Sequence, residues 1–146
     1  MNRYRTLLAA LAAVFVVAAL SACSQEGTLF VNEGNAYTAE NVTTVLDTAD
    51  AGGASGRPTS DAADLRQKAM VSLRKQGGEA AAAADVLTKT FANSSPGVPY
   101  YVEKATFDDA EAWVVAEVIG PKDGALKDKR IWVISDTGEV LYSGTR

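Results

Sequence analysis

Four apolar runs follow one another closely at the end of the chain, and residues typical of turns separate them. Runs of this kind, rich in Val, Ile, Tyr and Trp, indicate β-strands. Because the connections are short, consecutive strands must pair in the antiparallel direction. The sequence therefore predicts a meander sheet of three or four strands, drawn from Tyr100–Phe107, Ala112–Gly120, Ile131–Ser135 and Val140–Ser143.

Two helical patterns precede these strands. Residues 60 and 61, a serine and an aspartate, can cap a helix that runs to about Gln76, where two glycines stop it. A second, alanine-rich helix is expected from Glu79 to about Phe91. Helices followed by a meander predict an α+β domain over residues 60–146, with helix packed on one face of the sheet.

The segment before residue 60 is less regular. Leu29–Val31 is a short apolar run that could form an edge strand, and Thr38 could cap a short helix that reaches Asp50. Ala51–Pro58 is rich in Gly, Ala and Ser and indicates a flexible connector. Residues 23–59 are therefore expected to form a separate N-terminal segment, and whether it packs on the domain stays open.

The first 22 residues have the three parts of an export signal. Arg3 and Arg5 form a basic start, Leu7–Leu20 carries no charge, and small residues follow. The run ends in Leu20-Ser21-Ala22-Cys23, which resembles the lipobox of bacterial lipoproteins. That resemblance implies that signal peptidase II removes residues 1–22 and that a diacylglyceryl lipid, with palmitate-type chains, is joined to Cys23.

A lipid on Cys23 would tether the protein to the cell membrane with its domain on the extracytoplasmic side. Two acyl chains make such attachment stable, whereas one chain gives only marginal binding. The alternatives are an uncleaved anchor helix and an ordinary signal peptide. Inner and outer membrane are not distinguished, and the alanine-rich composition resembles that of actinobacterial proteins.

The charge of the chain narrows its partners. The chain has 14 basic and 18 acidic residues, and removing Arg3 and Arg5 with the leader leaves 12 basic residues and a net charge of −6. Nucleic-acid binding requires clustered basic residues, so nucleic acid is not expected as a partner. Since Cys23 is the only cysteine, no intramolecular disulfide is available.

The C-terminal half resembles the PepSY domain. The resemblance covers about Ala82 to Ser143 and rests on a helix followed by three strands. Its residues are Trp113–Val118 in the central strand, Ile131–Ile134 in the next, and Asp136-Thr137-Gly138-Glu139-Val140-Leu141 at the last turn. Cystatin-like and nuclear-transport-factor-like sheets could give the same pattern. A PepSY-like domain implies a module that holds or restrains an extracytoplasmic peptidase.

The central strand is apolar on both faces, although a sheet covered on one side should alternate apolar with polar residues. Ala112, Val114 and Ala116 are small and suit contact with the alanine-rich helix. The other face would then be a candidate interaction surface with Glu117 partly exposed, made of Trp113, Val115, Ile119, Ile131, Val133 and Tyr142. The alternative is that the Leu65 helix, or the segment around Val42 and Leu46, covers that face as core.

Residues for catalysis are mostly missing. The chain has no histidine, its cysteine is assigned to the lipid, and no Gly-x-Ser-x-Gly motif is present. No cofactor, metal or catalytic residue is therefore predicted. The sequence predicts a non-catalytic lipoprotein that binds a protein partner, with a small-molecule or envelope-polymer binder as the alternative.

Overall fold

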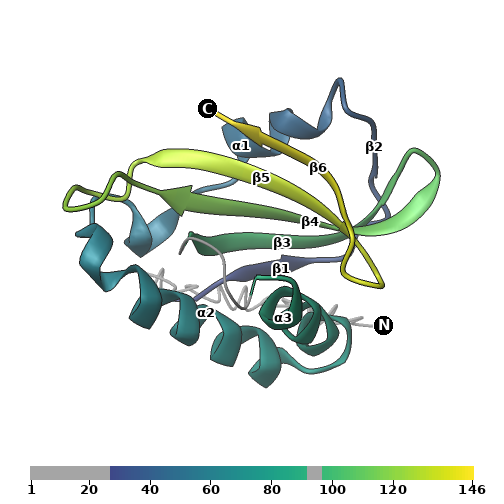
Figure 1. Cartoon of the computed structure of the whole chain (residues 1–146). Coiled ribbons are helices and arrows are strands. Elements are labelled where there is room, and N and C mark those ends of the chain that lie inside the picture. The colour runs from purple at the N-terminus through teal and green to yellow at the C-terminus, as the bar shows by residue number, and fades with distance from the viewer. Residues whose placement is uncertain (1–26, 92–96) are drawn as a thin grey trace, which may run out of the picture.

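The computed structural model describes residues 27–91 and 97–146 and places three α-helices on a mixed six-stranded sheet. An α+β fold is thus confirmed (Figure 1). The strands are β1 (Leu29–Val31), β2 (Ala36–Tyr37), β3 (Val98–Phe107), β4 (Ala110–Ile119), β5 (Asp128–Ser135) and β6 (Val140–Thr145). The helices are α1 (Val45–Thr48), α2 (Ala62–Gln76) and α3 (Gly78–Thr90), and 3₁₀ turns cover Val42–Thr44, Gly52–Ala54 and Thr59–Asp61.

The sheet is larger than predicted. Strands β3 to β6 form the expected antiparallel meander, and β1 and β2 add to the outer edge of β3 in the parallel direction. The sheet order is β1-β3-β4-β5-β6, which leaves β6 as the free edge on the other side. The predicted edge strand at Leu29–Val31 is confirmed, but the sheet is mixed rather than a pure meander.

The two long helices lie near their predicted ranges. Gly77, between α2 and α3, and Gly78, the first residue of α3, both have positive φ angles (72° and 52°) that side-chain-bearing residues rarely adopt. The chain therefore turns sharply, and α2 and α3 pack side by side across one face of the sheet (Figure 1). Four helix residues with little bulk are buried there, Ala69, Ala80, Ala83 and Ala84.

The other sheet face is covered by the segment that precedes residue 60. Val42, Val45 and Leu46 are buried against β3, β4 and β5 in a second core (Figure 1). The expected connector at 51–58 also contacts the domain, through Ala51 in the same core and a bridge from Pro58 to Ala125. Residues 27–59 are thus part of one folded unit, and the predicted boundary at residue 60 does not separate two units.

The predicted orientation of the sheet faces is wrong. Trp113 and Val115 pack under α2 and α3, whereas Ala112, Val114 and Ala116 face the α1 side. The physical reason is complementary volume: alanines on the helices leave space that the large indole of Trp113 fills. Pairing small residues with small residues would have left a void.

Candidate functional site

The predicted interaction surface is not a surface. Trp113 is 3% exposed and Val115, Ile131 and Val133 are fully buried. The predicted set also divides between the two faces, because the register pairs Val114 with Val133 and Trp113 with Ile134. Trp113, Val115 and Ile119 belong to the α2–α3 side, and Ile131, Val133 and Tyr142 belong to the α1 side.

Glu117, taken from the sequence as a sign of exposure, is 1% exposed. Its carboxylate accepts hydrogen bonds from Arg66 Nη1 at 3.1 Å, Arg130 Nη2 at 2.9 Å and Trp132 Nε1 at 2.9 Å. A buried carboxylate is tolerated only when it is paired and hydrogen-bonded in this way. Two arginines from α2 and β5 therefore allow a charge beneath the helices.

A second buried carboxylate fastens the N-terminal strands to the sheet. Glu103, fully buried on β3, accepts hydrogen bonds from Asn35 Nδ2 and from the hydroxyls of Tyr37 and Tyr101, each of the latter at 2.9 Å. Burial, followed by the hydrogen bond to Glu103, raises the pKa of Tyr37 to about 12 and also raises that of Tyr101. Both hydroxyls stay protonated at neutral pH and serve as donors.

A groove with a volume of about 1180 Å³ lies between β1 and α2. β1 begins at Leu29, which lies opposite Tyr101 of the parallel strand β3. The first residues of β3 therefore extend beyond the start of β1, and the groove lies beside them. The Asp50–Ala54 segment closes the side opposite α2. We call this feature the β1–α2 groove.

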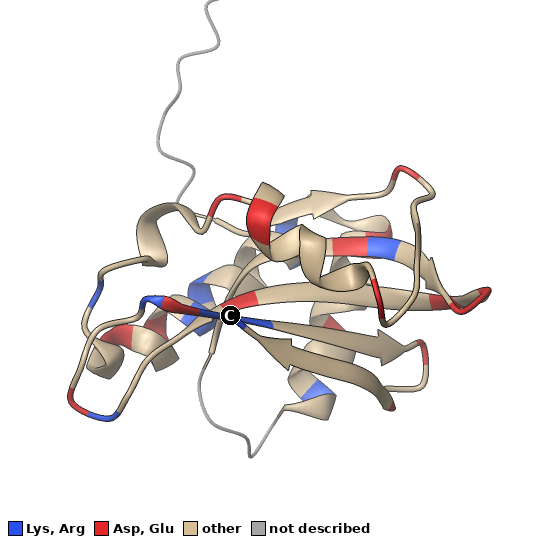
Figure 2. Ribbon diagram, turned by 90° about the horizontal axis from the view of Figure 1, so that it is seen from above, with Lys and Arg blue, Asp and Glu red and all other residues tan. Residues whose placement is uncertain are grey.

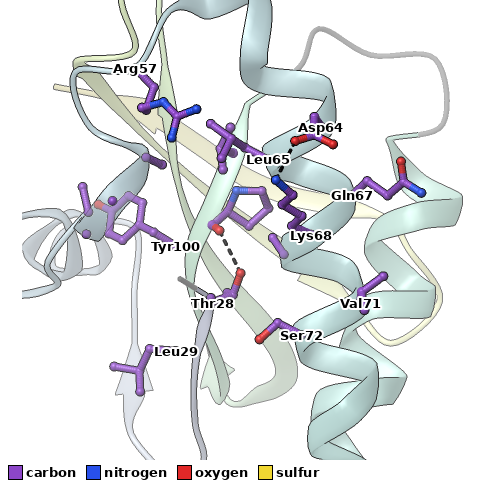
Figure 3. Close-up of a pocket in the computed structure, with 18 of the residues that line it drawn as sticks. Thr28, Leu29, Arg57, Asp64, Leu65, Gln67, Lys68, Val71, Ser72 and Tyr100 are labelled. Carbon is purple, nitrogen blue, oxygen red and sulfur yellow. Dashed lines mark hydrogen bonds and ion pairs between the residues drawn. The ribbon is translucent and has the colours of Figure 1, made fainter. Parts of the chain in front are cut away.

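Each wall of the β1–α2 groove is held by its own contacts. Thr28 Oγ1 donates to the carbonyl of Pro99 at 2.9 Å, and Gln76 Nε2 donates to the carbonyl of Thr28 at 3.2 Å (Figure 3). These bonds tie the start of β1 both to the sheet and to the end of α2. The two hydrogen bonds therefore fix the position of β1 between β3 and α2.

The lining of the groove is mixed in character. Leu65, Val98 and Tyr100 supply apolar surface at one end, and Leu29 and Val71 lie on opposite sides at the other (Figure 3). The charged lining residues are Arg57, Lys68 and Lys75 against Asp50 and Asp64, with Lys68 Nζ 2.9 Å from Asp64 Oδ2. Ligand sites commonly combine apolar walls with a few polar groups in this way.

Tyr100 carries an unusual hydroxyl. The side chain is 5% exposed and borders the groove, and its oxygen has no hydrogen-bond partner among the described residues. Burial, and then the negative charge of Asp50, raises the pKa of Tyr100 to about 12. Buried hydroxyls without a hydrogen-bond partner are rare in native structures.

The sequence offered only one sign of this groove. Val71 stands outside the apolar stripe that Leu65, Ala69 and Leu73 form, on a helix face shared with Lys68 and Lys75. An isolated apolar residue on a polar helix face is weak evidence by itself. The contribution of β1 could not be foreseen, because it depends on pairing with a strand about 70 residues later.

Other predicted features are not assigned by the structure. Leu20, Ser21, Ala22 and Cys23 lie outside the described residues, so lipidation stays a prediction. No described helix has the length and apolar character needed to cross a membrane. Within 27–91 and 97–146, no three side chains of the metal-ligating types come together.

Comparison with known proteins does not extend this description. Neither family models, nor curated proteins, nor solved structures gave a match to this chain. The resemblances to a lipobox and to the PepSY domain therefore remain predictions from the sequence.

Proposed function

We propose that this protein is a membrane-anchored extracytoplasmic lipoprotein whose domain binds a small amphipathic molecule or envelope fragment and catalyses no reaction. The observation that supports it is the β1–α2 groove, a hollow of about 1180 Å³ lined by both apolar and charged residues. Drug-sized ligand sites occupy about 300–1,000 Å³, so this groove has room for one such ligand.

The anchor has a direct test. Mass spectrometry of the protein from its native membrane should find the chain beginning at Cys23, with the mass of a diacylglyceryl group added. A Cys23→Ala variant should lose that mass and leave the membrane fraction. Wild-type protein that begins elsewhere, or that carries no lipid, would overturn this half of the proposal.

The groove has a separate test that does not depend on the anchor. Protein taken from its own envelope is examined by native mass spectrometry for a retained small molecule. Thermal unfolding is then measured with lysophosphatidylglycerol and with muramyl dipeptide as probes. A ligand that binds only the folded state at 100 times its Kd stabilises by about 2.7 kcal/mol, which is readily seen as a higher Tm.

A matched pair of variants assigns any binding to the groove. Gly53 borders the groove and a Cβ there would meet no atom within 4 Å, so Gly53→Trp starts its side chain in open space beside the groove. Ser143→Trp adds the same bulk on β6, the far edge of the sheet. Binding lost in Gly53→Trp and kept in Ser143→Trp supports the groove. Equal binding by both variants, or none by the wild type, contradicts it.

A protein partner remains a second candidate, now at a different place. Val140 and Leu141 are 43% and 39% exposed on β6, whose outer edge pairs with no strand among residues 27–91 and 97–146. Extended segments of partner proteins add to sheet edges of this kind. A PepSY-like restraint of a peptidase would use this edge. In-cell cross-linking of the wild-type protein should then capture an extracytoplasmic peptidase, and cross-linking of the Leu141→Arg variant should not.

A further inference from the structure

The groove lies very close to the predicted point of membrane attachment. Gly27, the first described residue, lines the β1–α2 groove and is four residues after Cys23. Four residues of fully extended chain span at most about 14 Å. The limit comes from covalent geometry alone, and it also holds if the leader is an uncleaved anchor that ends near Ala22.

Two exposed apolar side chains stand on this side of the molecule. Leu29 is 48% exposed and Val71 is 42% exposed, and both belong to the small group of large apolar residues that the described chain leaves exposed. They come from β1 and α2, on opposite sides of the groove, with Thr28 and Ser72 between them (Figure 3). Singly exposed apolar residues are common on protein surfaces, so Leu29 and Val71 matter here through their position beside the predicted anchor.

The charge around the groove differs from that of the whole protein. In the protein as a whole, basic residues are scattered among a larger number of acidic ones (Figure 2). Three basic and two acidic residues line the groove, but Lys68 is paired with Asp64 and Arg57 with Asp61. Lys75 is therefore the basic residue on which the attraction to a membrane depends. Lysines near an anionic leaflet are attracted to it, and their aliphatic stems can lie along apolar surface.

We infer that the rim of the β1–α2 groove docks on the phospholipid bilayer that holds the anchor, with Leu29 and Val71 at the headgroup level. The short tether keeps this rim at a high local concentration beside the membrane, so weak contacts are enough to orient the domain. The groove then opens toward the bilayer, and β6 points away from it. This inference rests on the membrane attachment in the proposed function, and it does not require a ligand.

The test uses the complete lipidated protein in vesicles of phosphatidylethanolamine and phosphatidylglycerol. Since the lipid occupies the sulfur of Cys23, a cysteine placed at another site is the only reactive thiol. Val71→Cys and Val140→Cys form a matched pair, because their native side chains are 42% and 43% exposed, the first on α2 beside the groove and the second on β6, the sheet edge opposite β1. Each variant is labelled with a polarity-sensitive fluorophore.

Docking predicts that lipid-borne quenchers act several-fold more strongly on the label at position 71 than on the label at 140. Iodide in the water should show the opposite order. Adding Lys75→Glu to the Val71→Cys variant should reduce quenching from the lipid, because a repulsive charge replaces an attractive one. Circular dichroism confirms that each variant, substituted only at exposed positions, is folded.

Two negative results have different meanings. If the protein sediments with the vesicles but both labels are quenched equally, the anchor is correct and the docked orientation is wrong. If the lipidated protein does not sediment with vesicles, the proposed attachment itself fails, and the docking fails with it.

Discussion

The stability of this fold should depend strongly on its two buried carboxylates and their hydrogen-bond donors. Glu117 and Glu103 lie on neighbouring strands, and each is surrounded by donors rather than by water. Glu117 relies on two arginines, and Glu103 relies on neutral donors. Removing a donor should therefore lower the free energy of unfolding more than removing an exposed ion pair does, because the carboxylate stays in the interior without its partner.

Arg130→Met is the direct test of the Glu117 cluster. The substitution removes the guanidinium that donates to Glu117 through Nε and Nη2, so we expect the free energy of unfolding to fall by about 3 kcal/mol. Arg57→Met removes an exposed ion pair with Asp61 and should cost less than about 1 kcal/mol. Urea unfolding measures both, and equal small losses would show that the cluster is not stabilising.

Tyr37→Phe and Tyr100→Phe separate a bonded hydroxyl from an unbonded one. Tyr37 donates to Glu103, and losing a hydrogen bond to a charged group costs about 1.5–3 kcal/mol. The Tyr100 hydroxyl is buried without a partner among the described residues, so its removal should be neutral or stabilising. Unfolding at pH 7 in the absence of ligand gives the comparison, and a greater loss in Tyr100→Phe would contradict it.

The raised pKa values of these tyrosines predict that the folded state loses stability in alkali. In the unfolded chain their hydroxyls lose protons near a pKa of about 10, whereas burial raises the pKa of Tyr37 and Tyr100 to about 12 in the folded protein. Between these values the unfolded state binds fewer protons, so its free energy falls relative to the native state as the pH rises. The stabilisation is complete below pH 10 and is lost toward pH 12. Thermal unfolding across this range measures it, and an unchanged Tm would refute the assignment.

At the scale of elements, the turn between β3 and β4 shows what the sequence can and cannot predict. The sequence places a connection at residues 108–111, and the structure narrows it to Asp108 and Asp109. Both have positive φ angles (48° and 66°), as a two-residue turn of type I′ requires. Glycine is the preferred second residue of that turn, so the native sequence is strained at position 109.

Asp109→Gly should therefore raise the free energy of unfolding by about 1 kcal/mol, because glycine adopts positive φ without steric cost. Asp128→Gly is the control: it lies in β5, has no positive φ, and should lose stability through increased freedom of the unfolded chain. Thermal unfolding compares the two variants. A loss of stability in both would show that the turn at 109 carries no strain.

Local chemistry made the helices and the hairpins predictable. Glycines 77 and 78 end one helix and separate it from the next, and short connections fix the antiparallel order of β3 to β6. The face of the sheet to which each strand side chain points was not predictable. The connection before β5 is long enough to permit either register, and a shift of one residue moves every side chain of the strand to the opposite face.

The candidate site was even less accessible from the sequence, because it joins parts that are distant along the chain. The groove needs β1 to stop short of the first residues of β3, and it needs α2 to cross beside them. Neither relation leaves a local pattern. The leader, by contrast, is a contiguous motif, so the sequence by itself predicts an anchor, and that anchor stays a prediction.

At the scale of the whole molecule, the sheet is a layer between two covers of unequal size. Helices α2 and α3 cover one face, and the short 42–48 segment covers the other with Val42, Val45 and Leu46. That small cover protects Val114 and Val133, which are fully buried. A domain cut at residue 60, as the sequence suggests, would expose this face to water.

Residues 60–146 alone should therefore fail to form the native state. Their α1-side face would be uncovered, so we expect loss of near-ultraviolet circular dichroism and a tendency to aggregate. Leu46→Ala tests the same cover in the whole chain, where the deletion of buried atoms should lower the free energy of unfolding by about 2–5 kcal/mol. Leu141→Ala, at a residue 39% exposed on β6, should change the stability by no more than about 0.5 kcal/mol. If the fragment folds with the Tm of the longer chain, the 27–59 segment is an appendage, and the wall that β1 gives the groove would then not be a fixed part of the domain.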